Sequence, residues 1–460
     1  MYIKTNKKKV VMHKRIYENT PNLQYLGKSQ RFILFQAENF LKPFMRFLYT
    51  KMDIRLVKTF FDAFMAIILH RDRDKGLLLS ELGGFITGFS KAPSGTKRLS
   101  NLFRSKKWSL EDIELIHLQK AQAQVTHLET QGHRLLGFID DSTIEKSESW
   151  WAEGLCSVYS SKAKRLTRIK PGYYNPPKNR ICVPGYQWTA LMIGGFRLTP
   201  IVGLMKWWTT KGQHKECADN IFYRLLKQIK SVFGSSLTLV LDRAFANLPT
   251  LERLFKCEQD FIIRWKSGHL LTDLEGQTKN TWRICHGKKS MDRRTVWDKE
   301  RKNALNLEII YAPVLHPECL DKPMTLVVIR PKNVNAQHPM YLLTNQEIDT
   351  SGMAWEMFFS YIQRWDIEQA FRFLKSELGI QSIRLHEFKN RLKLMALVTL
   401  VFEFLLTLYR NWQAVAWVWI NTLCPRTDKR FLKARLPIYR LRMAMQIIVL
   451  KIFYLSINTT

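Results

Sequence analysis

Hydrophobic and polar positions follow different rhythms along the chain, and the changes of rhythm divide it into regions. Residues 1–130 carry apolar residues at helical spacing, as in the stretch 51–71, which has no Gly or Pro. From about residue 131 short apolar runs typical of strands take over, and only 217–234 and 247–259 interrupt them with helical spacing. The pattern therefore predicts a helical region followed by a mixed region of strands and helices.

The order of the predicted elements indicates the fold class. Between 131 and 267 three strands are followed by a helix, a strand, a helix and a strand, which is typical of an α/β fold with a mixed sheet. Residues 268–345 read as a β-rich insertion, and helical spacing returns at 346–385. We expect residues 386–460 to form a basic helical C-terminal region, so that helical regions precede and follow the sheet in the sequence.

The charge balance adds information about the partner. The chain has 72 Lys and Arg against 39 Asp and Glu, a formal net charge of +33. With 46% hydrophobic and 12% aromatic residues it can bury a large core, which excludes a disordered basic tail protein. A folded protein with this excess of positive charge favours a polyanionic partner, nucleic acid first and an anionic membrane surface second.

Several features argue against a membrane or secreted protein. The longest apolar run, 394–409, contains Glu403 and is shorter than the roughly 20 residues of a spanning helix, so we expect a buried core helix. No apolar stretch of signal-peptide length follows the basic N-terminus. The seven Cys form no C-x-x-C pair, which favours neither a zinc ribbon nor a disulfide framework. The prediction is a cytoplasmic protein with no membrane partner, associated with the nucleoid when it is bound to DNA.

Two segments are basic and free of acidic residues. Residues 82–110 contain six basic residues, and their centre, 92–108, begins with turn residues and continues as a short helix. Such a helix could contact DNA as in helix-turn-helix modules, or form a solvated helical face. Residues 154–215 contain eleven basic residues, and 160–180 within them read as a Pro-, Tyr- and Lys-rich loop. That loop suits a phosphate backbone, with a solvated loop as the alternative.

Four carboxylates stand out by their positions. Asp140 and Asp141 end one predicted strand, Asp242 ends another, and Glu368 lies on a helix far downstream. Carboxylates at such places can hold two divalent cations about 4 Å apart, which clamp the attacking and leaving oxygens of a phosphoryl transfer. Acids at strand ends are common, however, so these positions alone are a weak indication.

The helix around Glu368 strengthens the case. At about 100° per residue one stripe of this helix carries Tyr361, Arg364, Glu368, Arg372 and Lys375. A different arc of about 100° is apolar and should face the core: Ile367, Ala370, Phe371, Leu374 and Leu378. Phenol and basic groups donate to phosphate, and a lone carboxylate among them suits a metal ion between acid and phosphate. The alternative is an exposed helix on which Glu368 pairs with Arg364 or Arg372.

At this point the sequence resembles a known family. Tyr361, Arg364, Glu368 and Lys375 match the Y-x2-R-x3-E-x6-K signature of bacterial insertion-sequence DDE transposases of the insertion-sequence-four-like group. Asp242 in VLDRAFA resembles the second-aspartate motif of that family. Asp141 in DDSTIEK resembles its D-D-T-x3-K variant, with Ser142 in place of Thr. The resemblance runs from about residue 135 to 380.

The resemblance implies a fold and an activity. It implies a ribonuclease-H-like catalytic core that begins at about 131, is interrupted by the β-rich insertion at 268–345, and resumes in the Glu-bearing helix within 346–385. The activity would be that of a transposase encoded by a mobile element. It would bind the ends of its insertion sequence and catalyse metal-dependent DNA cleavage and strand transfer, and so DNA transposition and recombination.

The resemblance also implies a set of site residues and a cofactor. Two Mg²⁺ ions, for which Mn²⁺ could substitute, would be held by the catalytic Asp141, Asp242 and Glu368. Side chains alternate along a strand, so only one aspartate of the adjacent pair should face the site, and the family alignment favours Asp141 over Asp140. The family motif implies that phosphates near the cut are bound by Tyr361, Arg364 and Lys375, and Arg372 on the same stripe completes the expected DNA-binding set.

The implied partners are double-stranded DNA molecules, namely terminal inverted repeats and target DNA, with a homodimer assembled on the DNA. The helical region 1–130 would bind DNA. Some relatives stack a Trp of the insertion on a flipped base, for which Trp282 and Trp297 are candidates beside the alternative of simple packing. Two other functions stay open: a metal-dependent DNA nuclease without transposition, and a catalytically silent DNA-binding protein.

Overall fold

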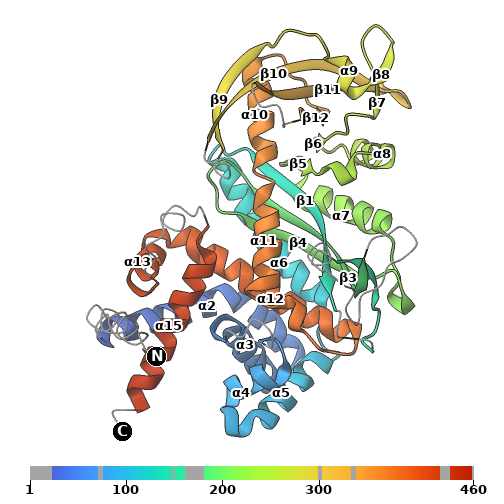
Figure 1. The fold of residues 1–460 in the computed structure, drawn as a ribbon. Coiled ribbons are helices and arrows are strands. Elements are labelled where there is room, and N and C mark those ends of the chain that lie inside the picture. Colours follow the sequence, from blue (N-terminus) through green and yellow to red (C-terminus); the bar gives the residue numbers. More distant parts are fainter. Residues whose placement is uncertain are drawn as a thin grey trace, which may run out of the picture. The chain divides into compact units, whose positions relative to one another are not determined.

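The computed structural model (Figure 1) describes residues 23–70, 76–146, 149, 151–160, 181–298, 303–332, 338–424 and 436–457. The chain divides into two compact units. One, the helical unit, draws on Met1–Ile116, Lys146–Glu153 and Arg372–Thr460. The other, the sheet unit, draws on His117–Glu145 and Gly154–Phe371. The predicted α/β class, with a mixed sheet and helical regions on both sides of it in the sequence, is confirmed.

Five strands form the centre of the sheet unit: β1 (Leu135–Glu145), β3 (Cys182–Gly194), β4 (Ile201–Trp208), β5 (Leu237–Leu241) and β6 (Phe261–Arg264). β1, β3 and β4 pair antiparallel, whereas β5 pairs parallel to β1 and β6 parallel to β5. Two helices connect the later strands: α7 (Ala218–Phe233) precedes β5 and α8 (Leu248–Lys256) precedes β6. Three antiparallel strands followed by two parallel strands with connecting helices is the ribonuclease-H-like topology that was expected.

The burial of these strands explains their sequence pattern. All five residues of β5 and the first five of β1 are buried. Strands covered on both faces read as continuous apolar runs rather than as alternating ones. The apolar faces of the connecting helices complete the same core, with Leu225 of α7 and Leu251 and Leu254 of α8 fully buried.

The predicted insertion extends the same sheet. It contains β7 (Leu270–Thr272), β8 (Thr278–Asn280), α9 (Thr281–Ile284), β9 (Asp292–Asp298), β10 (Asn303–His316), β11 (Cys319–Lys332) and β12 (Met340–Thr344). β10 and β11 form a long hairpin, and β12 pairs with both β11 and β6. With β2 (Cys156–Tyr159) on the far side of β3, the result is one twelve-stranded sheet. The region is β-rich as predicted, although α9 adds a short helical turn.

The helical unit contains α2 (Leu23–Lys51), α3 (Ile54–Leu69), α4 (Leu79–Thr87), α5 (Ala92–Arg104), α12 (Phe388–Asn411), α13 (Gln413–Leu423) and α15 (Ile438–Ile457). α6 (Leu110–Thr130) begins in it and ends in the sheet unit. The helical prediction for 1–130 is borne out over the described part, while residues 1–22 lie outside it. Of the predicted loop at 160–180, residues 161–180 also fall outside the described residues.

Helix α12 contains the longest apolar run of the chain. It is long and apolar enough to cross a membrane, yet 89% of its most apolar window is buried inside the protein. Within the described residues it is the only helix with these properties. The prediction of a buried core helix is therefore confirmed.

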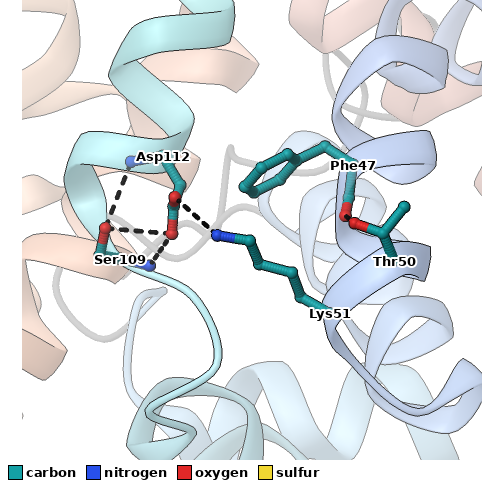
Figure 2. Close-up of polar contacts among 5 residues, drawn as sticks. All are labelled: Phe47, Thr50, Lys51, Ser109 and Asp112. Carbon is teal, nitrogen blue, oxygen red and sulfur yellow. Dashed lines mark hydrogen bonds and ion pairs between the residues drawn. The ribbon is translucent and has the colours of Figure 1, made fainter.

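Capping of helix α6 illustrates how local sequence sets an element boundary. Asp112 accepts hydrogen bonds from the backbone N–H of Ser109 at 2.8 Å and from its hydroxyl at 3.1 Å. The Ser109 hydroxyl in turn accepts one from the Asp112 N–H at 3.2 Å (Figure 2). Lys51 at the end of α2 donates to the same carboxylate at 3.3 Å. The hydroxyl of the preceding residue, Thr50, donates a hydrogen bond to the Phe47 carbonyl. This reciprocal capping fixes the start of α6.

Buried basic side chains of the late helices hold the ends of the early ones. Lys393 of α12 donates to the carbonyls of Phe103 and Ser105 at the end of α5. Arg442 of α15 donates to three carbonyls at the end of α3, those of Ile67, Ile68 and His70, and to the Glu377 carbonyl. The last carbonyls of a helix have no partner within it, so these donors stabilise both helix ends.

Candidate active site

Strand β1 sends its two adjacent aspartates to opposite faces of the sheet. Asp140 lies beside Ala190 of β3, and Asp141 lies beside Thr189. The Asp141 carboxylate accepts a 2.6 Å hydrogen bond from the Thr189 hydroxyl, which itself accepts one from the Trp208 indole at 3.1 Å. Strands β3 and β4 thus hold Asp141 in place on one face.

The other face brings Asp140 together with Asp242. Ile139 pairs with Leu241 across the parallel strands β1 and β5, which lie side by side in Figure 1. The next residues, Asp140 and Asp242, therefore lie level, and their charges repel each other. Asp242 follows the end of β5 as predicted, but β1 continues to Glu145, so the prediction that Asp140 and Asp141 end their strand is wrong. Asp242 also caps the short helical turn that follows, accepting a hydrogen bond from the Arg243 N–H. The register places two carboxylates side by side where β5 ends.

Arg364 connects these strands to the helix that carries Glu368. One guanidinium nitrogen lies 2.7 Å from the Asp140 carboxylate, and another donates to the Glu368 carboxylate. The guanidinium also lies 6.0 Å from the centre of the Tyr361 ring. A single cation thus bridges acids that are far apart in the sequence, and Asp242 lies within its electrostatic reach.

The helix around this arginine is broken, so the prediction of one continuous helix is wrong. α10 (Ser351–Ile362) ends before α11 (Trp365–Ser376) begins. Tight i to i+3 bonds connect the two: Arg364 N–H donates to the Tyr361 carbonyl and Asp366 N–H to the Gln363 carbonyl, both at 3.0 Å. Such a turn rotates the chain further about the helix axis per residue than an α-helix does. The five polar residues predicted to line one stripe of the helix therefore do not share one exposed face.

The break separates the five residues by exposure. Tyr361 ends α10 with only 5% of its surface exposed, whereas Glu368 is exposed on α11. Arg364 lies at the junction with 13% of its side chain exposed. Further along α11, in the part that belongs to the helical unit, Arg372 is exposed and Lys375 is half-buried.

The apolar arc predicted for this segment is confirmed. Its members are all buried: Ile367, Ala370, Phe371, Leu374 and Leu378. The Phe371 ring packs edge-on against Trp188 of β3 with 4.5 Å between centroids. This contact fixes the first turns of α11 to the sheet and hence positions Glu368.

Burial and charge shift the pKa values at the site in different directions. Burial raises the pKa of Asp140 to about 6, although the Arg364 charge opposes the shift. Burial also raises the pKa of Asp141, against the effect of its bond from Thr189. For Arg364 burial alone would lower the pKa, but the Asp140 charge raises it above its ordinary value. Burial raises the pKa of Tyr361, so the arginine stays charged and the phenol stays protonated at neutral pH.

The donor chemistry of the site suits a divalent cation. Asp140, Asp242 and Glu368 offer only carboxylate oxygens, which Mg²⁺ prefers. Among the residues that the structure describes, no three His, Cys, Asp or Glu side chains already converge on one point. The Arg364 guanidinium occupies the position between Asp140 and Glu368, so a divalent cation would compete with it for these two acids.

Comparison with known proteins gives this arrangement a family context. Residues 218–402 match the family model of the transposase DDE domain. The matched DDE segment contains Asp242, Arg364 and Glu368, and it begins after the aspartates of β1. No curated protein matches the chain.

One solved structure is also similar in fold. It is the cryo-EM structure of a piggyBac transposase synaptic complex with hairpin DNA, which is 12% identical with a TM-score of 0.41. The alignment covers 88% of this chain and 76% of that one. At this identity and score the likeness bears on neither function nor site residues.

The two Trp residues singled out in the β-rich insertion are both exposed. Trp297 on β9 is 60% exposed, and Trp282 on α9 is 38% exposed. Trp282 already stacks against neighbours, with the Arg283 guanidinium 5.1 Å from its ring centre and His286 edge-on at 5.5 Å. Trp297 is therefore the freer surface for stacking, and its role stays a prediction.

Proposed function

We propose that this protein is a transposase that binds the ends of a mobile DNA element, cuts the DNA there and joins the freed ends to target DNA. One observation carries the proposal: Arg364 bridges the acids of β1 and α11 at the edge where Asp242 ends β5. Two carboxylates on a ribonuclease-H-like sheet and a third on α11, in a chain of which residues 218–402 match the transposase DDE domain, suit metal-dependent phosphoryl transfer.

We assign the metal-binding role to Asp140, Asp242 and Glu368. This revises the expectation for Asp141, because its carboxylate turns to the opposite face and bonds Thr189. Two Mg²⁺ ions, or Mn²⁺ in their place, would supply stabilisation of the charge on the attacking and leaving oxygens. Asp141 acts as a positioning residue that ties β1 to β3.

The basic residues of the segment bind DNA phosphates in this proposal. Arg364, Arg372 and Lys375 are donors that match phosphate oxygens, and the Tyr361 hydroxyl, buried without a hydrogen bond in the described part of the chain, is a further donor. Arg364 has a second task. A phosphate that attracts its guanidinium would release Asp140 and Glu368, so DNA would help to make these carboxylates available.

The Y-R-E-K spacing supports assignment to the insertion-sequence-four-like group of bacterial transposases. The partners are then terminal inverted repeats and target DNA, held by a homodimer because two ends must be brought together. The place of action is the bacterial cytoplasm. Trp297 of the β-rich insertion would stack on an unpaired base if the ends are processed through a hairpin.

The test uses the full-length protein and a plasmid that carries the DNA flanking its gene. We expect cuts at defined ends and joined products with Mg²⁺, none with EDTA, and none with Glu368→Gln. The matched control is Glu356→Gln, which makes the same change at an exposed carboxylate of α10. Cutting without joined products would indicate a nuclease, and end-specific binding without cutting would indicate a silent DNA-binding protein.

A further inference from the structure

Helices α4 and α5 of the helical unit form a compact pair. They are joined by Gly88–Lys91, where Gly88 has a positive φ of +87° and Phe89–Lys91 form a single 3-10 turn. The sequence predicted the turn within 92–95, but the structure begins α5 at Ala92, with Pro93 in its first turn. Pro is favoured there because its missing N–H has no partner within the helix anyway.

The two helices cross with their backbones in contact. A Cβ atom built on Gly95 would lie 2.2 Å from the Gly83 carbonyl oxygen, so no other residue fits at this crossing. Thr96 of α5 donates to the Leu79 carbonyl at the start of α4. Two helices joined by a four-residue turn that contains Gly, with α3 packed beside them, match the helix-turn-helix arrangement of DNA-binding proteins.

Helix α5 has two faces of opposite character. The face toward the protein consists of buried Gly95, Leu99, Leu102 and Phe103. The opposite face is exposed and consists of Ser94, Lys97, Asn101 and Arg104. At 100° per residue these four fall within one arc of about 80°, so they can meet one groove of a ligand together.

The charges on the exposed face of α5 have no ion-pair partner among the described residues. Within the described part of the chain neither Lys97 nor Arg104 forms an ion pair, and residues 82–110 contain no acid. Arg98, on the flank of the same helix, differs because it lies 2.8 Å from Asp62 of α3. The described residues thus neutralise Arg98 but not Lys97 or Arg104. This difference favours an anionic ligand on the exposed face of α5.

We propose that α5 is a recognition helix that enters the major groove of duplex DNA and reads part of the element end. Asn101 and Lys97 contact base edges, because Asn pairs with adenine N6 and N7 and Lys donates to guanine O6 and N7. Arg104 and the exposed Lys106 bind flanking phosphates. The inference rests on the proposed function for its DNA ligand, but it does not depend on cleavage.

The experiment selects binding sites for the full-length protein from a library of random-sequence DNA duplexes and then titrates the winning site. We expect Asn101→Ala to lose about 5- to 150-fold of discrimination at one base pair and to keep the preferences at the other positions. Arg104→Ala should weaken binding equally for all sequences and lower the salt slope by about one. Asn411→Ala, the same change at an exposed position of α12, should leave every preference intact.

Unchanged sequence preference in both Asn101→Ala and Lys97→Ala would overturn the recognition role of α5, as would a wild-type protein without sequence preference. Both side chains are exposed, so an unchanged thermal unfolding temperature verifies that the variants fold. The outcome is separable from that of the cleavage assay. A chain whose preference depends on Asn101 but which never cuts would support this inference while contradicting the proposed transposase activity.

Discussion

The exposed face of α5 and the acidic edge of the sheet are both polar sites, but they are built in opposite ways. The α5 face comes from a single helix, and within the described residues its Lys97 and Arg104 form no ion pair. The acidic edge joins β1 to α11, with Asp140 and Arg364 224 positions apart, and its charges are compensated by one another. A surface that binds a polyanion gains from free charge, whereas carboxylates gathered for chemistry repel each other and need a cation among them.

We expect the largest effect from substitutions that change only the acidic edge of the sheet. Asp242→Asn and Glu368→Gln each remove an oxygen donor for the proposed metal ions without removing a proposed DNA contact. We expect cleavage to fall by at least about a hundredfold, while binding to element ends stays near wild type. The measurement is single-turnover cleavage beside an end-binding titration. Equal losses in both assays would show that the acids serve the fold rather than the reaction.

The adjacent aspartates offer a sharper test of the same edge. Asp140→Asn should reduce cleavage about as strongly as Glu368→Gln, because both acids share Arg364. Asp141→Asn should cost no more than about tenfold, since an amide oxygen can still accept the Thr189 hydrogen bond. Cleavage rates of the two variants under identical conditions decide the matter. The reverse order would return the metal-binding role to Asp141.

Stability should depend on pH through Asp140. Burial raises its pKa in the folded protein from an ordinary value of 3.8 to about 6, so folding favours the protonated form. This contribution is fully present below pH 3.8 and is lost as the pH rises through 6. Between pH 4 and 7 the wild type should therefore lose about 2 kcal/mol more unfolding free energy than Asp140→Asn. Urea unfolding of both proteins at pH 4 and pH 7 measures this difference. An equal change of unfolding free energy in the two proteins would contradict a raised pKa for Asp140.

The smallest effect concerns single phosphate contacts. Lys375→Ala and Arg372→Ala should each weaken DNA binding and lower the salt slope by about one unit. Lys279→Ala is the control, because its ammonium is already paired with Asp273 at 2.8 Å and should release no counterion. Binding titrations over a range of salt concentrations give the slopes. A slope that changes for Lys279 but not for Lys375 would place the phosphates elsewhere.

The sequence predicts features that depend on local residues better than features that join distant segments. The helices, the buried run of α12 and the mixed α/β class follow local periodicity, and all three are observed. The choice between Asp140 and Asp141 depends on the register of β1 against β5, which no local pattern records. The break at Gln363 is equally hidden, because the residues on both sides of it keep helical spacing. Which aspartate lies beside Asp242 is set by a strand that is distant in the sequence, and periodicity does not show it.

The hydrogen bonds from Lys393 and Arg442 to the carbonyls at the ends of α5 and α3 have a consequence for synthesis of the protein. The ends of α3 and α5 leave the ribosome long before their partners, since 375 positions separate Ile67 from Arg442 and 290 separate Phe103 from Lys393. Contacts so distant in sequence form late and slow the folding of the unit they close. A nascent chain would therefore hold the ends of α3 and α5 without these donors until α12 and α15 have been translated. If α5 binds DNA as proposed, its full engagement would begin only after those two helices have been made.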